Sequence, residues 1–215
     1  MGGRYSVNMR LEAENISFRY MKKGDWVLRN INVQIEAGDS VALVGPSGCG
    51  KSTLAKILSG YIRPDEGQVL FDGKPLPLKG FCPVQMIFQH PELSVNPRHK
   101  MGKILHEAWK PDEKLLREMG IEDEWLSRWP NELSGGELQR FCIARVLGPD
   151  TRFLLCDEIS TMLDVITQAQ IWKIVQSVAA KNDIGLIVVT HNQALAERVC
   201  KRTITLQDSR HLKSL

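Results

Sequence analysis

The chain has 215 residues, of which 43% are hydrophobic and 25% are charged. These values exclude collagen-like and intrinsically disordered chains, and the length allows one domain with an insertion or two very small domains. The net charge of +3 gives no electrostatic footprint for a nucleic-acid partner, and the apolar runs are far shorter than the roughly 20 residues of a membrane-spanning helix. Five scattered cysteines without a C-x-x-C pair indicate a reducing compartment.

The first half of the chain predicts a strand-rich region followed by a buried strand and a helix. Residues 1–8 are expected to be an N-terminal extension. Between residues 9 and 35 apolar side chains recur at every second position, which predicts half-buried antiparallel strands. The continuous apolar run at residues 40–44 predicts a strand buried on both faces, and residues 51–60 carry a helical pattern. Two further strand patterns follow, at residues 69–73 and 84–88.

The composition changes in the middle of the chain and then returns to alternating elements. Prolines, tryptophans and short helical stretches predict a small, mostly helical insertion at about residues 90–130, and a helix at about 135–147 follows it. The helical subdomain is expected to cover about residues 90–150. Strand patterns at 153–156, 184–190 and 203–206 then alternate with helical ones. This alternation predicts an α/β fold with a parallel sheet, and ligands of such sheets bind beyond the carboxyl ends of the strands.

A phosphate-binding loop is predicted where the buried strand at residues 40–44 ends. The segment fits G-x-x-x-x-G-K-[ST] directly after a strand and at the start of a helix, which is the context this motif requires. Its glycines let backbone N–H groups face phosphate oxygens, and the helix N-terminus adds partial positive charge. Lys51 is expected to reach the terminal phosphates, and Ser52 to ligate Mg²⁺. The predicted nucleotide-binding residues are Gly45, Pro46, Ser47, Gly48, Cys49, Gly50, Lys51, Ser52 and Thr53.

Two carboxylates end the strand pattern at 153–156. Asp157 can hold Mg²⁺ directly or through water, whereas Glu158 is expected to point elsewhere because successive strand residues alternate. Glu158 can then accept a proton from an attacking water. His191 and Gln89 also follow strands. For each of these two residues the alternatives stay open: a ligand of phosphate, water or Mg²⁺, or an ordinary residue at a strand end.

A second anion-binding surface is predicted at residues 134–137. Ser134 is a candidate N-cap, and Glu137 three residues later completes a capping box. Gly135 and Gly136 leave the helix N-terminus bare, and a bare N-terminus binds anions. One phosphate loop already accounts for one nucleotide, so the second surface requires another explanation.

In their order along the chain, these motifs resemble those of the ATP-binding subunit of an ABC transporter. The Leu-Ser-Gly-Gly-Glu element, the Asp-Glu pair and a later Asp164 and His191 carry the resemblance, together with the phosphate loop. The resemblance implies a P-loop NTPase core with a mostly parallel central sheet, an N-terminal antiparallel β subdomain and a small helical subdomain. It also implies a single domain over residues 9–215 that hydrolyses ATP with Mg²⁺.

Roles for individual residues follow from the same resemblance. Tyr20 would stack on adenine, and Glu158 would be the catalytic base. His191 would be the switch histidine, and Gln89 would sense Mg²⁺ and couple to a membrane partner. In this family the element at residues 134–137 binds the γ-phosphate of ATP held by an opposite subunit, and the loop that contains Asp164 communicates across the dimer. The implied Mg²⁺ ligands are Ser52, Gln89 and Asp157.

The finer family assignment is that of an importer. The loop at residues 88–98 resembles that of oligopeptide, dipeptide and nickel importers. This resemblance implies three kinds of partner: transmembrane permeases, a second ATPase subunit (identical or different) and an extracytoplasmic solute-binding protein. It also implies a location at the cytoplasmic face of the cell membrane. An exporter subunit and a non-transport regulatory ATPase are the alternatives. Ile159 and Met162 replace the proline and alanine usual in the family, and this departure is the only support for the regulator.

Overall fold

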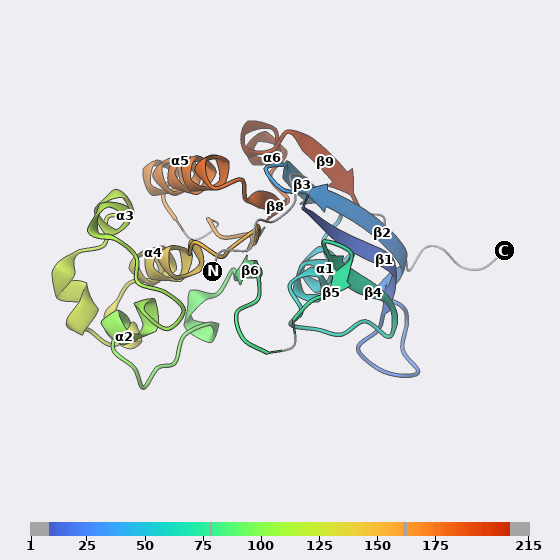
Figure 1. Ribbon diagram of the computed structural model, residues 1–215, viewed down its shortest axis with the longest axis horizontal. Coiled ribbons are helices and arrows are strands. Elements are labelled where there is room, and N and C mark those ends of the chain that lie inside the picture. The colour runs from blue at the N-terminus through green and yellow to red at the C-terminus, as the bar shows by residue number, and fades with distance from the viewer. Residues whose placement is uncertain (1–8, 78, 161–162, 207–215) are drawn as a thin grey trace.

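The computed structural model describes residues 9–77, 79–160 and 163–206. Two sheets form its framework, with helices packed on them (Figure 1). The antiparallel sheet has the order β2-β1-β4-β5 and confirms the predicted N-terminal β subdomain. Its strands are β1 (Arg10–Phe18), β2 (Leu28–Glu36), β4 (Glu66–Phe71) and β5 (Lys74–Pro75).

The central sheet has the order β6-β7-β8-β3-β9, and all its neighbouring strands are parallel. Every residue of β7 and β8 is buried, because these strands lie inside the sheet and both their faces are covered. The strands are β3 (Ser40–Val44), β6 (Val84–Ile87), β7 (Phe153–Asp157), β8 (Gly185–Val189) and β9 (Arg202–Thr205). The predicted α/β class with a parallel sheet is therefore confirmed.

Side chains of β7 point alternately into two hydrophobic clusters, one on each face of the central sheet. Phe153 and Leu155 belong to the cluster shared with the antiparallel sheet and with α1 (Lys51–Leu58). Leu154 and Cys156 belong to the opposite cluster. The helices of that opposite face are α4 (Gly135–Val146), α5 (Val165–Lys181) and the shorter α6 (Gln193–Val199). Figure 1 shows α1 beside the antiparallel strands, with α4 and α5 away from them.

Between β6 and β7 the described residues form helical elements without a strand, as expected of a helical insertion. These elements are η1 (Pro91–Leu93), α2 (Met101–Leu105), α3 (Glu113–Glu118), η2 (Asp123–Ser127), η3 (Pro130–Glu132) and α4. Figure 1 shows α2 and α3 at the end of the molecule that lies farthest from the antiparallel sheet.

No helix in the described part of the chain has the length and apolarity to cross a bilayer.

The topology places four predicted site segments at one edge of the central sheet. Because β6, β7, β8 and β3 are adjacent and parallel, their carboxyl ends lie side by side. The phosphate loop follows β3, and Gln89, Glu158 and His191 follow β6, β7 and β8. The extension at residues 1–8 and the departure at Met162 lie outside the described residues.

Candidate nucleotide-binding and hydrolysis site

The phosphate loop depends on glycine at positions where the backbone passes close to other atoms. Gly45 has φ 155° and Gly50 has φ 100°, in the region that favours glycine. A Cβ on Gly45 would lie 2.5 Å from the Leu206 carbonyl oxygen, and one on Gly50 would lie 2.7 Å from Leu28 Cδ2. Close packing and the positive φ therefore require glycine at both of these positions of the motif.

Lys51 places a buried ammonium group against this loop. Its side chain is 7% exposed, and Nζ donates hydrogen bonds of 2.9 Å to the carbonyl oxygens of Gly45 and Pro46. No residue in the first turn of α1 is acidic, so the helix itself supplies no negative side chain at its positive end. The loop borders a cavity of about 450 Å³ that is also lined by Tyr20, Gln89 and Glu158. A cation, a helix N-terminus and loop N–H groups together suit a polyphosphate.

Ser52 and Asp157 lie in direct contact, although 105 positions separate them in the sequence. Ser52 Oγ donates a hydrogen bond of 2.9 Å to Asp157 Oδ1. Asp157 is only 5% exposed, and its burial raises the pKa of the carboxyl group, against the lowering effect of the Ser52 hydrogen bond. A hydroxyl and a carboxylate at this spacing are hard oxygen donors of the kind that Mg²⁺ prefers alongside phosphate oxygens. These residues fit the predicted Mg²⁺ site.

Asp157→Asn is expected to stabilise the folded chain near neutral pH. A raised pKa means that the folded chain holds this proton at a higher pH than the unfolded chain, so stability is lost as pH rises through that interval. The neutral asparagine side chain removes the free-energy cost of burying the Asp157 carboxylate, and its carbonyl oxygen can still accept the hydrogen bond from Ser52. Thermal unfolding near neutral pH should show a higher midpoint for the variant, with a difference that shrinks on acidification. Equal midpoints near neutral pH would contradict the prediction.

Glu158 leaves the strand in a left-handed turn, with φ 49°. Its backbone N–H donates to the Val189 carbonyl oxygen at 3.1 Å. In the side chain, Oε1 lies 2.9 Å from His191 Nδ1, and Oε2 accepts a hydrogen bond of 3.2 Å from Gln89 Nε2. The structure thus brings together three predicted residues from the ends of three strands. The left-handed backbone, and not the strand alternation that we expected, sets the direction of the carboxylate.

Tyr20 lines the same cavity as Glu158. Its ring is 65% exposed and is held edge-on to Phe18, with ring centroids 5.0 Å apart. The Tyr20 hydroxyl lies 3.0 Å from Thr53 Oγ1, which ties the ring to the first turn of α1. An exposed, fixed aromatic ring beside a phosphate loop offers a surface on which a base can stack.

The Ser134–Glu137 segment forms the capped N-terminus of α4. Ser134 Oγ accepts from the Glu137 N–H at 3.3 Å, and Glu137 Oε2 accepts from the Ser134 N–H at 2.6 Å, which confirms the predicted capping box. The hydrogen bond from the Ser134 N–H, followed by a contribution from the Ser134 hydroxyl, lowers the pKa of the Glu137 carboxyl group. A Cβ on Gly135 would meet no atom within 4 Å, whereas one on Gly136 would lie 3.1 Å from Leu163 Cδ2. The helix terminus is therefore open at Gly135.

The open end of α4 lies in a different cavity from the phosphate loop. This cavity of about 760 Å³ is lined by residues 134–137 together with Leu163, Asp164 and others, and it shares no lining residue with the phosphate-loop cavity. Asp164 also has a local task that the sequence did not reveal. Its Oδ1 accepts hydrogen bonds of 3.0 Å from the N–H groups of Ile166 and Thr167, so Asp164 caps α5. Within one chain, the two predicted anion sites are separate.

The match to a protein family agrees with this arrangement. The family model described as ABC transporter matches residues 28–161. The chain belongs to the ABC transporter family. It is an ATPase cassette of that family, and the family assignment confirms the resemblance seen in the motifs.

Similar proteins include curated nickel import subunits. The chain is 37% identical to the nickel import ATP-binding protein NikE of Rhodospirillum rubrum, over 86% of this chain and 73% of the relative. It is 35% identical to the nickel import system ATP-binding protein NikE of Staphylococcus aureus, over 92% of this chain and 87% of that protein.

Among solved structures, the fold is similar to that of a dimeric ATP-binding cassette, MJ0796, in a post-hydrolysis state bound to ADP and Pi. The TM-score is 0.78 at 25% identity, and the match covers 92% of this chain and 94% of that one.

Two residues near the candidate site, Val27 and Ser160, could not be identified from the sequence. Val27 lines the nucleotide cavity from the loop before β2, where a single valine has no distinctive pattern. Ser160 is 3% exposed and accepts hydrogen bonds from two residues of α5, Gln168 and Trp172. The spacing of the two donors by four positions places them on one helix face, but only the packing of α5 shows that this face meets Ser160.

Proposed function

We propose that the chain is the ATP-binding and ATP-hydrolysing subunit of an ABC importer that powers uptake through separate membrane permeases. The observation that carries the proposal is the convergence of Gln89 and His191 on Glu158, whose side chain lines the phosphate-loop cavity together with Gln89. Nickel, as an ion or a chelate, is the favoured cargo because relatives 34–37% identical are nickel import subunits. Peptides are the second candidate.

Hydrolysis is proposed to proceed by attack of water on the terminal phosphorus of ATP. Glu158 accepts a proton of that water as the new P–O bond forms, and the bond to the ADP oxygen breaks. His191 and Gln89 hold the carboxylate through its two oxygens. Lys51 and the loop from Gly45 to Thr53 bind the phosphates, and Tyr20 stacks on the base. Bound Mg²⁺, held by Ser52, Asp157 and Gln89, would neutralise phosphate charge.

The chain is proposed to work as one half of a dimer. Its open α4 terminus and its phosphate loop line different cavities, so the residues at 134–137 are positioned to serve the nucleotide of a second cassette. Dimeric structures of a similar cassette support this arrangement. Residues 9–215 would form a single ATPase domain, with residues 90–150 as its helical subdomain. The permeases would hold it at the cytoplasmic face of the membrane, and an extracytoplasmic solute-binding protein would deliver cargo.

Uptake in cells tests the proposed transport function. Cells that depend on this chain should lose accumulation of radioactive nickel when it is replaced by the Glu158→Gln variant, because hydrolysis no longer resets the transporter. The wild-type chain, supplied on a plasmid at equal abundance, should restore uptake. The same cells should be tested with a labelled dipeptide. Loss of dipeptide uptake with normal nickel uptake would replace nickel by peptide as the cargo, and normal uptake of both would overturn the importer assignment.

A further inference from the structure

A hydrogen-bond network surrounds the buried hydroxyl of Ser160, close to Glu158 in the chain. Ser160, two residues along the chain, is 3% exposed, and its Oγ accepts hydrogen bonds of 2.7 Å from Gln168 Nε2 and 3.1 Å from Trp172 Nε1. Trp172 is 4% exposed. Buried hydrogen bonds of this kind fix their partners because leaving a donor unpaired costs free energy. The network therefore fastens the chain after Glu158 to α5.

The backbone at Glu158 needs such support. A non-glycine residue in the left-handed region is strained and persists only where its surroundings hold it. On its N-terminal side Glu158 is held by β7, and its N–H is bonded to Val189. On its C-terminal side Ile159 is 3% exposed, and Ser160 is held by the two donors from α5. Residues on both sides thus fix the turn that aims the carboxylate.

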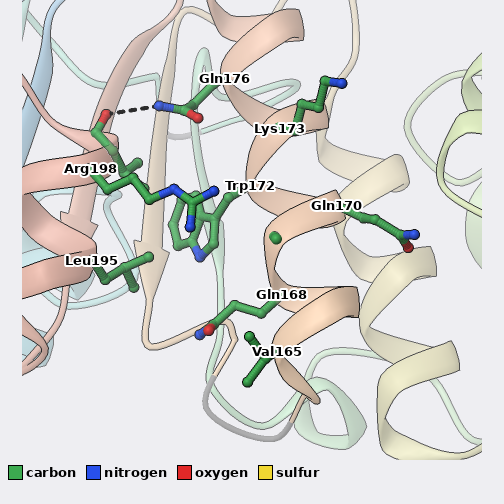
Figure 2. Close-up of a pocket in the computed structure, with 10 residues that line it drawn as sticks. Val165, Gln168, Gln170, Trp172, Lys173, Gln176, Leu195 and Arg198 are labelled. Atoms are coloured by element: carbon green, nitrogen blue, oxygen red, sulfur yellow. Dashed lines mark hydrogen bonds between the residues drawn. The ribbon is translucent and has the colours of Figure 1, made fainter.

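Gln168 and Trp172, the two hydrogen-bond donors to Ser160, line both an outer groove and a cavity at Glu158. Gln168 and Trp172 line a cavity of about 340 Å³ to which Glu158 and His191 also contribute. On the outer side they line a groove of about 360 Å³ between α5 and α6. Figure 2 shows the Trp172 indole between these helices, with Gln168 nearer the start of α5. The two residues that donate to Ser160 therefore border both the α5–α6 groove and the cavity at Glu158.

We propose that Ser160, Gln168 and Trp172 are positioning residues for ATP hydrolysis. The two α5 donors hold the Ser160 hydroxyl, Ser160 holds the turn at Glu158, and the turn aims the carboxylate at the attacking water. This inference rests on the proposed role of Glu158 as the base. Misplacing a catalytic group by about 1 Å can lower a rate as much as 100-fold, so loosening this support should reduce turnover while nucleotide binding is unchanged.

A matched pair of tryptophan variants tests the proposal on the full chain. Trp172→Phe removes the N–H donor and keeps an aromatic ring in the core. Trp109→Phe is the control, because Trp109 Nε1 donates an equivalent bond of 2.9 Å to the Arg145 carbonyl oxygen in the helical region. We expect Trp172→Phe to lower kcat roughly tenfold with an unchanged Kd for ATP, and Trp109→Phe to leave kcat unchanged. Equal kcat values for the two variants would overturn the proposal.

A second pair separates the hydroxyl from packing. Ser160→Thr and Ser160→Val add nearly the same volume to a buried position, but only threonine keeps an acceptor for the two donors. At matched thermal stability, the threonine variant should keep a higher kcat than the valine variant, with equal Kd for ATP. If both variants turn over ATP at the same rate, the hydroxyl has no positioning role.

Combination with Glu158→Gln distinguishes failure of this inference from failure of the proposed base. If Glu158 is the base, its loss should nearly stop turnover, and adding Trp172→Phe should lower the residual rate no further. An active Glu158→Gln enzyme would overturn the base assignment itself. An inactive one, together with equal rates for the two tryptophan variants, would overturn only the positioning role.

Discussion

Glu158→Gln should lower kcat by roughly 100- to 10,000-fold while ATP still binds with nearly wild-type affinity. This range is what loss of a general base costs. Glutamine has almost the same shape, and its amide can still form hydrogen bonds with Gln89 and His191, which now lie 3.2 Å and 2.9 Å from the two carboxylate oxygens. It cannot accept the proton of the attacking water at neutral pH. Phosphate release under saturating ATP, together with an equilibrium titration of ATP, measures both effects.

The matched control is the same chemical change at a surface position. Glu118 on α3 lies 3.9 Å from Lys114 in an exposed ion pair, away from the cavity that contains Glu158. Such pairs contribute little to stability, so Glu118→Gln should leave both kcat and ATP affinity unchanged. A Glu158→Gln variant with wild-type turnover would remove Glu158 from the mechanism.

Lys51→Ala should weaken ATP binding by roughly 100-fold or more, since truncating one partner of a buried charge pair costs about 2–5 kcal/mol. Without nucleotide, the ammonium is buried against the carbonyl oxygens of Gly45 and Pro46. It is therefore already inside the loop that would receive the phosphates. Thermal unfolding without nucleotide shows whether the variant is folded, and a titration with ATP measures the affinity.

Lys56→Ala is the control for this prediction. Lys56 lies on the same helix, in its last turn, and does not line the nucleotide cavity. It should bind ATP with nearly wild-type affinity. If Lys51→Ala is folded and binds ATP as tightly as the wild type, the loop is not the site of the nucleotide phosphates.

Much of the fold could be predicted from local patterns. The alternation of apolar residues at 9–35 predicted antiparallel strands, because a strand buried on one face is apolar at every second position. The continuous apolar runs predicted parallel strands, because a strand buried on both faces is apolar at every position. The capping box of Ser134 and Glu137 could likewise be predicted, because its two hydrogen bonds join residues three positions apart. Motifs of this kind are local, so the sequence contains all of their parts.

Long-range contacts could not be predicted in this way. Ser52 meets Asp157 across 105 positions, and Gln89 meets Glu158 across 69. These contacts exist because β6, β7, β8 and β3 are neighbours in one parallel sheet, and no periodicity encodes the order of strands. The burial of Asp157, which raises its pKa, also results from this packing.

The 215 residues and their composition thus determined a globular α/β chain with a phosphate loop, and the motif order determined the family resemblance. Only the tertiary structure decided where the Glu158 carboxylate points, because its φ of 49° depends on neighbours that the chain brings in from β8 and α5. The same holds for the two anion sites. Their motifs lie in one sequence, but the fold separates them into two cavities, so the chain is suited to act with a second cassette.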